Sequence, residues 1–197
     1  MNIEQQFDIL YPILNNKSAI SKESWNQAKV YFKTKTLKQG EHLFLMEDKV
    51  DDFYFLIQGL ARYYYLTEEG KEFNKSFAEK QGHLLSSISS VSYGTGSPFS
   101  VELLSDFTTL YISYKDLLQL TKKYEQWNDL LLRIYEDLVI KKEKREADFL
   151  LLNARQRYEK FLEDYSMIDD SVPNYHIASY LGITSVALSR IRKEMKN

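Results

Sequence analysis

Two short amphipathic helices are predicted at the start of the chain, before residue 34. Between Ile3 and Leu14, apolar residues recur at the spacing of one helix face. Ser21 has a side chain of the type that caps helix N-termini, so we expect a second helix after it. That helix would present Trp25, Ala28, Val30 and Phe32 on its apolar face.

From residue 34 to residue 113 the pattern changes to short strands. Runs rich in aromatic and aliphatic residues are separated by glycine, by aspartate and by a Thr-Glu-Glu-Gly turn at 67–70. The expected strands are His42–Leu45, Asp52–Gln58, Leu60–Leu66, Glu72–Ala78 and Leu110–Ser113. Short strands at this spacing predict an antiparallel β-roll or barrel. Gly59 lies between two runs and suits a hairpin corner, because glycine accepts a positive φ.

Residues 82–100 interrupt these strands with a segment that is rich in small polar residues. It contains seven serines, three glycines and one proline, a composition typical of a flexible surface loop. Small residues and hydroxyl groups could equally form the lip of a ligand site. No lysine follows the glycines in the pattern of a phosphate-binding loop, so a nucleoside triphosphate is not expected there.

A long helical pattern without glycine or proline runs from residue 126 to residue 152. Its apolar residues alternate at spacings of four, three and four, as in the seam of a coiled coil. These residues are Trp127, Leu131, Ile134 and Leu138. The seam then continues through the charged residues Lys141 and Arg145. We expect this helix to pair with a second copy of the chain, and the alternative is a helix that lies against the roll.

The C-terminal region, residues 153–197, is expected to form a second small domain that begins at a helix cap, Asn153. Residues 174–196 satisfy the positional requirements of a helix-turn-helix. Ala178 is small where two helices would cross, Gly182 permits the turn, and Thr184 can cap the second helix. The residues that would pack the helices together are Ile177, Leu181, Ile183, Leu188 and Ile191. An ordinary antiparallel helix pair is the alternative.

The second helix of this motif is expected to face DNA, because such a helix enters the major groove. Its candidate contact residues are Thr184, Ser185, Val186, Ser189, Arg190 and Lys193. Arg190 can donate two hydrogen bonds to guanine, and Val186 can contact a thymine methyl group. The basic residues from 184 onward are Arg190, Arg192, Lys193 and Lys196. With Glu194 they make this end locally +3 on a chain of net charge −2.

Composition and charge exclude several classes of protein. The chain has 26 Lys and Arg against 28 Asp and Glu, so it is not a globally basic nucleic-acid coat. The absence of cysteine excludes disulfides, a thiol nucleophile and a cysteine-ligated iron–sulfur cluster. The three histidines, His42, His83 and His176, are far apart in sequence, so no metal site is expected.

The sequence does not favour an enzyme or a membrane protein. No nucleophile motif and no pair of histidine and carboxylate occurs, so we expect no catalytic residues. The first ten residues lack the basic start and apolar run of a signal peptide, and no apolar stretch of 18 residues occurs. A cytoplasmic protein that does not contact a membrane is therefore expected.

The chain resembles the Crp/Fnr family of transcriptional regulators, which are related to the cyclic-AMP receptor protein. The matching stretches lie between residues 34 and 195: LKQGE at 37–41, FYFLIQGLARYYYLTEEGKE, Gln81-Gly82, VELL at 101–104, Ile112-Ser113, RYEKFL and IASYLGIT with LSRIRKE. The resemblance implies an α+β protein in three parts. These are a cyclic-nucleotide-binding-like effector domain with an antiparallel β-roll (1–125), a long dimerisation helix (126–152) and a helix-turn-helix DNA-binding domain (153–197).

The effector site departs from the pattern of the cyclic-nucleotide-binding members. In those members a Gly-Glu pair holds the ribose and an Arg-Ser or Arg-Thr pair holds the cyclic phosphate. Here Gly82 is followed by His83, and the arginine position falls at Ser97-Pro98. Without that arginine the phosphate loses its charge-assisted partner, so we predict that cyclic AMP is not the ligand. The resemblance places the effector pocket at Gly82, His83, Leu84, Ser97 and Pro98.

His83 could replace part of the missing positive charge, or it could be a structural histidine. The sequence ends at Asn197, just after the second helix of the predicted motif, as in a shorter branch of the family. In that branch the usual β-wing is absent, and we expect fewer contacts to the DNA backbone and a weaker dependence of binding on salt.

The sequence therefore predicts a dimeric regulator that binds palindromic double-stranded DNA and senses an unknown small-molecule effector with its roll. RNA polymerase is a further candidate partner, and a histidine could serve as an axial ligand if the chain were a haem- or metal-sensing member. The alternative function is a ligand-binding or protein-interaction module whose shortened C-terminal domain no longer reads DNA.

Overall fold

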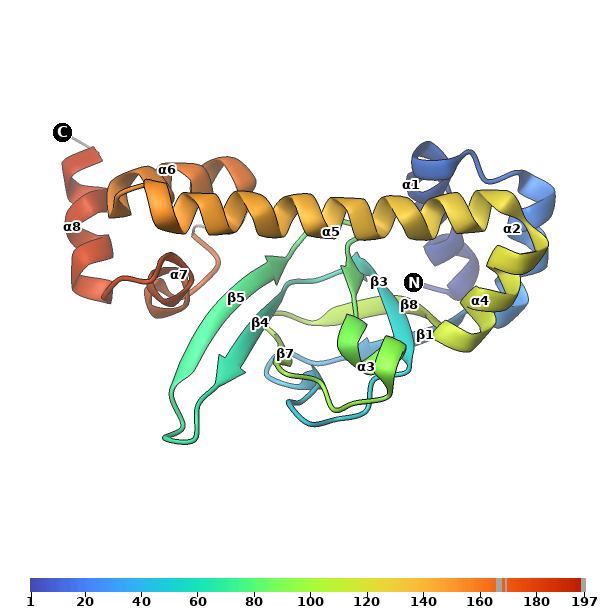
Figure 1. Cartoon of the computed structure of the whole chain (residues 1–197), viewed down its shortest axis with the longest axis horizontal. Helices are drawn as coiled ribbons and strands as arrows, with labels where there is room; N and C mark the ends of the chain where they lie inside the picture. Colours follow the sequence, from blue (N-terminus) through green and yellow to red (C-terminus); the bar gives the residue numbers. More distant parts are fainter. Residues whose placement is uncertain (166–167, 169, 196–197) are drawn as a thin grey trace.

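The computed structural model of the chain describes residues 1–165, 168 and 170–195. It is an α+β protein in which a long helix, α5 (Glu125–Leu151), runs across a β-roll, with short helices at both of its ends (Figure 1). The N-terminal helices lie at one end of α5 and the C-terminal helices at the other. The predicted α+β class and antiparallel roll are confirmed.

The N-terminal helices form where the sequence places their caps. Helix α1 (Ile3–Ser18) begins with a capping box at Asn2, and α2 (Lys22–Ala28) begins at Ser21, whose side chain accepts a hydrogen bond from the Ser24 amide. Helix α2 ends earlier than predicted and is followed by a 3-10 turn, η1 (Lys29–Tyr31). Val30 therefore leaves the apolar face where the sequence placed it and is 79% exposed.

Two four-stranded antiparallel sheets make up the roll, in the orders β1-β8-β3-β6 and β2-β7-β4-β5. The first sheet contains β1 (Lys33–Leu37), β3 (Asp52–Gln58), β6 (Leu84–Leu85) and β8 (Phe107–Ser113). The second contains β2 (His42–Phe44), β4 (Ala61–Leu66), β5 (Glu72–Ala78) and β7 (Ser100–Leu103). The strand pattern missed β1, β6 and β7, which are polar or too short to show an alternation.

Gly59 does not form the predicted hairpin. Strand β3, before it, pairs with β6 and β8, whereas β4, after it, pairs with β5 and β7 in the other sheet. The chain crosses between sheets at Gly59, where φ is +118° and an added Cβ would lie 2.6 Å from the carbonyl oxygen of Asp106. Glycine is thus required here by close approach of the backbone as well as by φ.

Helix α5 begins one residue before its predicted start and packs against the roll and the N-terminal helices through its first half. It follows α4 (Tyr114–Lys123), which Ser113 caps. Trp127 is fully buried, stacks on Trp25 at a centroid distance of 6.2 Å, and donates a 2.7 Å hydrogen bond from Nε1 to the Ser24 hydroxyl.

This packing corrects the predicted dimer seam. Trp127, Leu131 and Ile134 are buried in the core that α1, α2 and the first sheet share with α5. Their side chains are used within the chain and are not available to a second copy. Only Leu138 of the predicted set is half-buried and lies outside this core. The spacing was that of a helix lying against the roll, the alternative noted from the sequence.

The C-terminal helices are α6 (Ala154–Asp164), α7 (Asn174–Leu181) and α8 (Ser185–Met195). Asn153 caps α6 with a capping box, and a three-residue turn at 182–184 joins α7 to α8. Gly182 has a φ of +68°, as expected for a glycine that ends a helix. The core of these helices also contains Leu60 and Phe77 from the roll, so the region packs onto the roll.

Residues 82–100 are not the flexible surface loop that their composition suggested. They form β6 and the short helix α3 (Ile88–Tyr93), and Ser87, Ser90 and Ser97 are fully buried. The Ser90 hydroxyl accepts a 2.8 Å hydrogen bond from the Val50 amide. The buried Ser90 and Ser97 hydroxyl groups therefore pair with backbone groups, as buried polar groups usually do.

Candidate functional site

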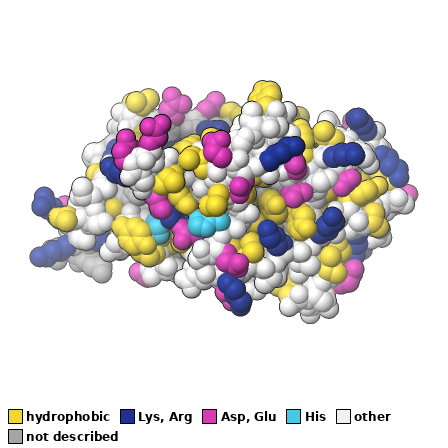
Figure 2. Space-filling view, turned by 90° about the horizontal axis from the view of Figure 1, so that it is seen from below, with side chains coloured by type: hydrophobic (Ala, Val, Ile, Leu, Met, Phe, Trp, Pro, Cys, Tyr) yellow, Lys and Arg dark blue, Asp and Glu magenta, His cyan; other side chains and the backbone are white. Residues whose placement is uncertain are grey.

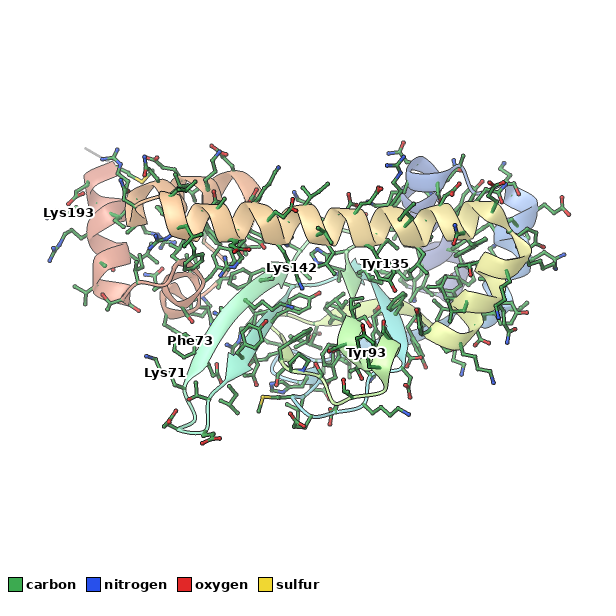
Figure 3. The ribbon with its side chains drawn as sticks, in the orientation of Figure 1. Lys71, Phe73, Tyr93, Tyr135, Lys142 and Lys193 are labelled. Carbon is green, nitrogen blue, oxygen red and sulfur yellow. The ribbon has the colours of Figure 1, made fainter. Side chains whose placement is uncertain are left out.

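The structure brings the six candidate DNA-contacting residues together on one exposed surface. Thr184, Ser185, Val186, Ser189, Arg190 and Lys193 are all exposed, on α8 and the residue before it. Val186 is an apolar side chain that is 71% exposed. Lys193 points away from the body of the molecule at its end (Figure 3), and Lys and Arg side chains gather at the same end in Figure 2.

The opposite face of α8 packs as the sequence predicted. Leu188 and Ile191 of α8 and Ile177, Ala178 and Leu181 of α7 are buried in one cluster, and Ile183 packs against it. Thr184 caps α8, since its hydroxyl accepts a hydrogen bond from the Ala187 amide at 3.2 Å. These contacts fix which side of α8 faces solvent.

One basic residue of α8 has a structural position that the sequence did not reveal. Arg192 donates a 2.9 Å hydrogen bond from Nε to the Tyr158 hydroxyl and a second bond from its guanidinium to the Asn174 side chain. It therefore holds α8 against α6 and α7. Lys196, which contributed to the predicted local charge, lies outside the described residues.

Helix α7 is held on strand β5 by hydrogen bonds. The Asn74 amide donates to the Ser179 hydroxyl at 2.9 Å, and Asn74 Nδ2 donates to the His176 carbonyl oxygen at 2.8 Å. Arg62 in turn donates to Asn74 Oδ1 at 2.9 Å and is paired with Glu102. This places the C-terminal helices on the roll, in contact with the part of the chain expected to sense an effector.

The surroundings of His176, in the contact between α7 and β5, disfavour protonation of its imidazole. His176 is buried beside Arg62, and burial together with that guanidinium lowers the pKa of His176 to about 4. The imidazole is therefore neutral near pH 7, and adding a proton would place a second positive charge next to Arg62.

A cleft of ≈ 320 Å³ lies where the roll, α5 and the C-terminal helices meet. The roll contributes Phe77, Glu79, Lys80 and His83, and α5 contributes residues between 137 and 148. The far wall contains Tyr165 and Tyr180. The cleft thus contacts the roll, α5 and the C-terminal helices together.

Of the five predicted effector-pocket residues, only His83 lines this cleft. Gly82 has a φ of +75°, and an added Cβ would lie 2.5 Å from Ile13 of α1, so its role is in packing. Ser97 is fully buried, and its backbone pairs with residues 47 and 48. Leu84 lies in β6, whereas Pro98 is exposed. Gly82, Leu84, Ser97 and Pro98 therefore lie outside this cleft, and the predicted effector pocket stays a prediction.

His83 cannot supply the positive charge that the missing arginine would bring. Burial, with smaller effects from Lys141 and Lys80, lowers the pKa of His83 to about 3. A neutral imidazole near pH 7 provides no ion pair for a cyclic phosphate. Its ring lies beside Tyr63 at a centroid distance of 6.3 Å, which is consistent with a structural role.

Sequence reasoning missed the residues that α5 turns toward the roll in its second half. Lys141 donates to the Ser76 hydroxyl at 3.0 Å, and Arg145 donates to the Tyr180 carbonyl oxygen at 2.9 Å. The sequence did contain a signal, since these two charged residues continue the apolar spacing of the helix. At these two positions α5 faces polar groups of the roll and of α7 and makes hydrogen bonds with them in place of apolar contacts.

Two further sites are absent from the described part of the chain. Among the residues 1–165, 168 and 170–195, no group of three or more His, Cys, Asp or Glu side chains is placed to hold a metal ion. No described helix combines the length and apolar composition that crossing a membrane requires.

The chain is similar to one known domain family and to several solved structures. Residues 34–124 match the family described as the cyclic nucleotide-binding domain. The fold resembles FixK2 from Bradyrhizobium japonicum, with 16% identity, 84% of each chain covered and a TM-score of 0.73. It also resembles a mutant of CooA from Carboxydothermus hydrogenoformans, with 19% identity, 95% of this chain and 84% of the other covered, and a TM-score of 0.73.

A third similar structure is the c-di-GMP-responsive global regulator CLP from Xanthomonas campestris, with 14% identity and a TM-score of 0.70. It covers 89% of this chain and 92% of its own. No curated protein sequence matches the chain significantly. Residues 34–124 therefore match the cyclic nucleotide-binding domain family, and over most of its length the chain has a fold similar to those of FixK2, CooA and CLP.

Proposed function

We propose that the chain is a sequence-specific DNA-binding transcriptional regulator in which α8 enters the major groove. One observation supports this most strongly: the six residues named from the sequence as DNA contacts are all exposed, while Leu188 and Ile191 on the other face of α8 are buried. The surface ends in Arg190 and Lys193, so it presents positive charge where the phosphate backbone would lie.

The reading of individual bases follows from side-chain chemistry. Arg190 is exposed and can donate two parallel hydrogen bonds to guanine O6 and N7. Val186 offers a methyl-sized apolar contact for thymine. Ser185 and Ser189 can donate to phosphates or to base edges. Arg192 is committed to Tyr158 and Asn174, so it supports the helix and does not read DNA.

A homodimer is the second part of the proposal, formed through the face of α5 that the roll leaves uncovered. Leu132, Val139 and Leu150 are exposed and fall on one line of the helix, two turns and then three turns apart. Apolar side chains in a line along an exposed helix are expected to pack against the same line of a second chain.

Sedimentation velocity tests this interface. Val139→Glu places a charge in the middle of the apolar line without touching the core, so we expect it to sediment as a monomer while the wild type sediments as a dimer. The control is Lys122→Glu, which adds the same charge at an exposed residue of α4. Leu118 of the same helix packs on the core, so a charge there would test folding and not the interface. A dimeric Val139→Glu protein would contradict this interface.

Selection from a random duplex library tests the DNA proposal. The wild type is expected to enrich a palindrome with half-sites about ten base pairs apart, since a dimer presents two copies of α8. Arg190→Ala should lose about 1–3 kcal/mol of discrimination at one base position in each half-site. Lys122→Ala removes one exposed positive charge at the opposite end of the molecule and is the matched control.

Salt dependence separates phosphate contacts from base contacts. Lys193→Ala should weaken binding about equally for all sequences and reduce the slope of log K against log salt by about 1 for each subunit. If no sequence is enriched and binding is weak and independent of Arg190, the DNA proposal fails. The alternative of a ligand-binding or protein-interaction module would then be favoured.

We propose further that the roll senses an effector other than cyclic AMP. The position of the phosphate-binding arginine is occupied by Ser97, which is fully buried against residues 47 and 48. His83 is neutral and cannot replace that charge. Isothermal titration calorimetry should detect no binding of cyclic AMP at micromolar concentration, and micromolar affinity would contradict the proposal.

A further inference from the structure

The cleft between the roll and the C-terminal helices contains a carboxylate without a partner. Glu79 follows β5, and neither of its side-chain oxygens has a hydrogen-bond partner among the described residues, although both are buried. Burial raises the pKa of Glu79. A buried carboxylate without a donor is costly, and native structures usually supply one. A donor that enters the cleft from outside would remove this cost.

The opposite wall presents cations that also lack a charged partner. Lys141 and Arg145 of α5 make no ion pair within 4 Å among the described residues, and their donors go to the neutral oxygens of Ser76 and Tyr180. Lys141 is half-buried and lies near the Tyr165 ring at 5.3 Å. An anionic group would satisfy these cations better than a hydroxyl or a carbonyl does.

Glu79, which has no hydrogen-bond partner, and Lys141, which donates only to a hydroxyl, stand on different elements and form no ion pair with each other. Glu79 follows β5 and Lys141 belongs to α5, and no ion pair within 4 Å joins them, but the Lys141 charge is near enough to oppose the effect of burial on the pKa of Glu79. Both residues line the cleft, with the acceptor on the roll and the donor on α5. A ligand that places a positive group at the first and a negative group at the second would bridge them.

The overall charge of the lining argues against a simple anion. The cleft is lined by four cations, Lys80, Lys141, Lys144 and Arg145, and by four acidic residues, Glu79, Asp137, Asp148 and Asp164. Their formal charges sum to zero and both signs occur on the roll and on α5, so a multivalent anion would be attracted by the cations and repelled by the carboxylates. A molecule that has both charges and no net charge fits this lining best.

The remaining lining is apolar or aromatic. Phe77, Ile140, Tyr165 and Tyr180 contribute to the walls of the cleft. An apolar group of the ligand would therefore be removed from water when it binds. The cleft volume of ≈ 320 Å³ lies at the lower end of the range for ligand pockets, which suits a molecule of about ten heavy atoms.

We propose that this cleft binds a small zwitterion of the amino-acid class with an apolar side chain. Its ammonium group contacts the Glu79 carboxylate, its carboxylate contacts Lys141, and its side chain lies against the aromatic wall. The cleft is formed by the roll, α5 and the C-terminal helices together, so a bound ligand ties these parts to one another. Binding is measured without DNA, so it stands or fails separately from the proposed DNA recognition.

Calorimetry with matched probes tests each contact. L-Leucine and L-phenylalanine are the zwitterions, 4-methylvalerate lacks the ammonium group of leucine, and 3-methylbutylamine lacks its carboxylate. We expect at least one of the zwitterions to bind about tenfold or more tightly than the acid or the amine alone, since each charged contact contributes separately.

Two variants locate the site. Glu79→Gln should weaken the zwitterion about tenfold and leave 4-methylvalerate unchanged, whereas Lys141→Met should do the same for the zwitterion and leave 3-methylbutylamine unchanged. Lys122→Met, an exposed lysine on α4, is the control. Thermal unfolding without ligand shows whether each variant is folded. If only one of the two variants folds, that variant alone tests the site. The proposal is overturned if neither zwitterion binds, or if both variants bind it as the wild type does.

Discussion

Lys75 allows the energetic cost of a buried cation in this fold to be measured. It lies on β5, half-buried, with its ammonium nitrogen 3.7 Å from the centre of the Phe99 ring. Burial, and then the neighbouring cations Lys142, Lys141 and Arg145, lowers the pKa of Lys75 from 10.5 to about 8. Lys142 lies on α5 above β5 in Figure 3.

The size of the cost follows from that difference. At 1.36 kcal/mol per pH unit, a change from 10.5 to about 8 disfavours the charged form in the folded state by about 3 kcal/mol. Lys75→Met removes the charge and keeps a side chain of similar length. It also loses the contact of the ammonium group with Phe99, which is worth about 0.5–1 kcal/mol. We therefore expect the variant to be more stable at pH 7 by about 2 kcal/mol.

The dependence on pH provides the control. Between pH 8 and pH 10.5 the unfolded chain keeps the Lys75 proton that the folded chain has lost, so the stability of the wild type rises with pH in this window. The variant lacks this rise, and the difference between the two proteins should shrink from pH 7 to pH 10. Urea unfolding followed by circular dichroism at both values measures it. A variant that is less stable at pH 7, or a difference that does not change with pH, would refute the reasoning.

Three further predictions concern the fold and its dependence on pH. Gly59→Ala should lower the free energy of unfolding by about 3 kcal/mol or more, because its Cβ would lie 2.6 Å from the carbonyl oxygen of Asp106. The control Gly70→Ala has open space around its Cβ and should cost about 1 kcal/mol; urea unfolding measures both. Ser24→Ala leaves the buried Trp127 indole donor without its acceptor and should cost about 1–3 kcal/mol, and a near-neutral result would contradict this hydrogen bond. The pKa of His83 is lowered to about 3, so the unfolded chain takes up a proton first as pH falls below 6.5. His83 alone should cost the wild type about 2.7 kcal/mol of stability by pH 4.5, and His83→Gln should lack this part of the loss over the same titration.

The C-terminal helices show how far local sequence determines structure here. Ala178, Gly182 and Thr184 act within their own turn: one is small at a crossing, one takes a positive φ, and one caps the helix. The apolar period of α8 then fixes which residues are buried, so the exposed set could be named in advance. These are effects of neighbouring residues, and a sequence states them directly.

The long helix shows where local reasoning stops. The spacing of Trp127, Leu131 and Ile134 specifies a helix with one apolar face, but the same spacing fits a second copy of the chain and the chain's own roll. The tertiary structure decides for the roll, because α1, α2 and the first sheet offer an apolar surface that needs a cover. Likewise, Gly59 could be recognised as a turn, but not as the crossing between two sheets.

The sequence by itself determined the long helices, several of their caps, the presence of an antiparallel roll and the exposed face of α8, since each depends on residues a few positions apart. Only the tertiary structure decided the partner of α5, the docking of α7 on Asn74, and the cleft in which Glu79 faces Lys141. Those features join residues about 60 to 100 positions apart, as in the pair of Asn74 and His176, which are separated by 102. The spacing of apolar residues along the chain does not predict such a contact, because it forms only when the helices and strands pack together into the folded chain.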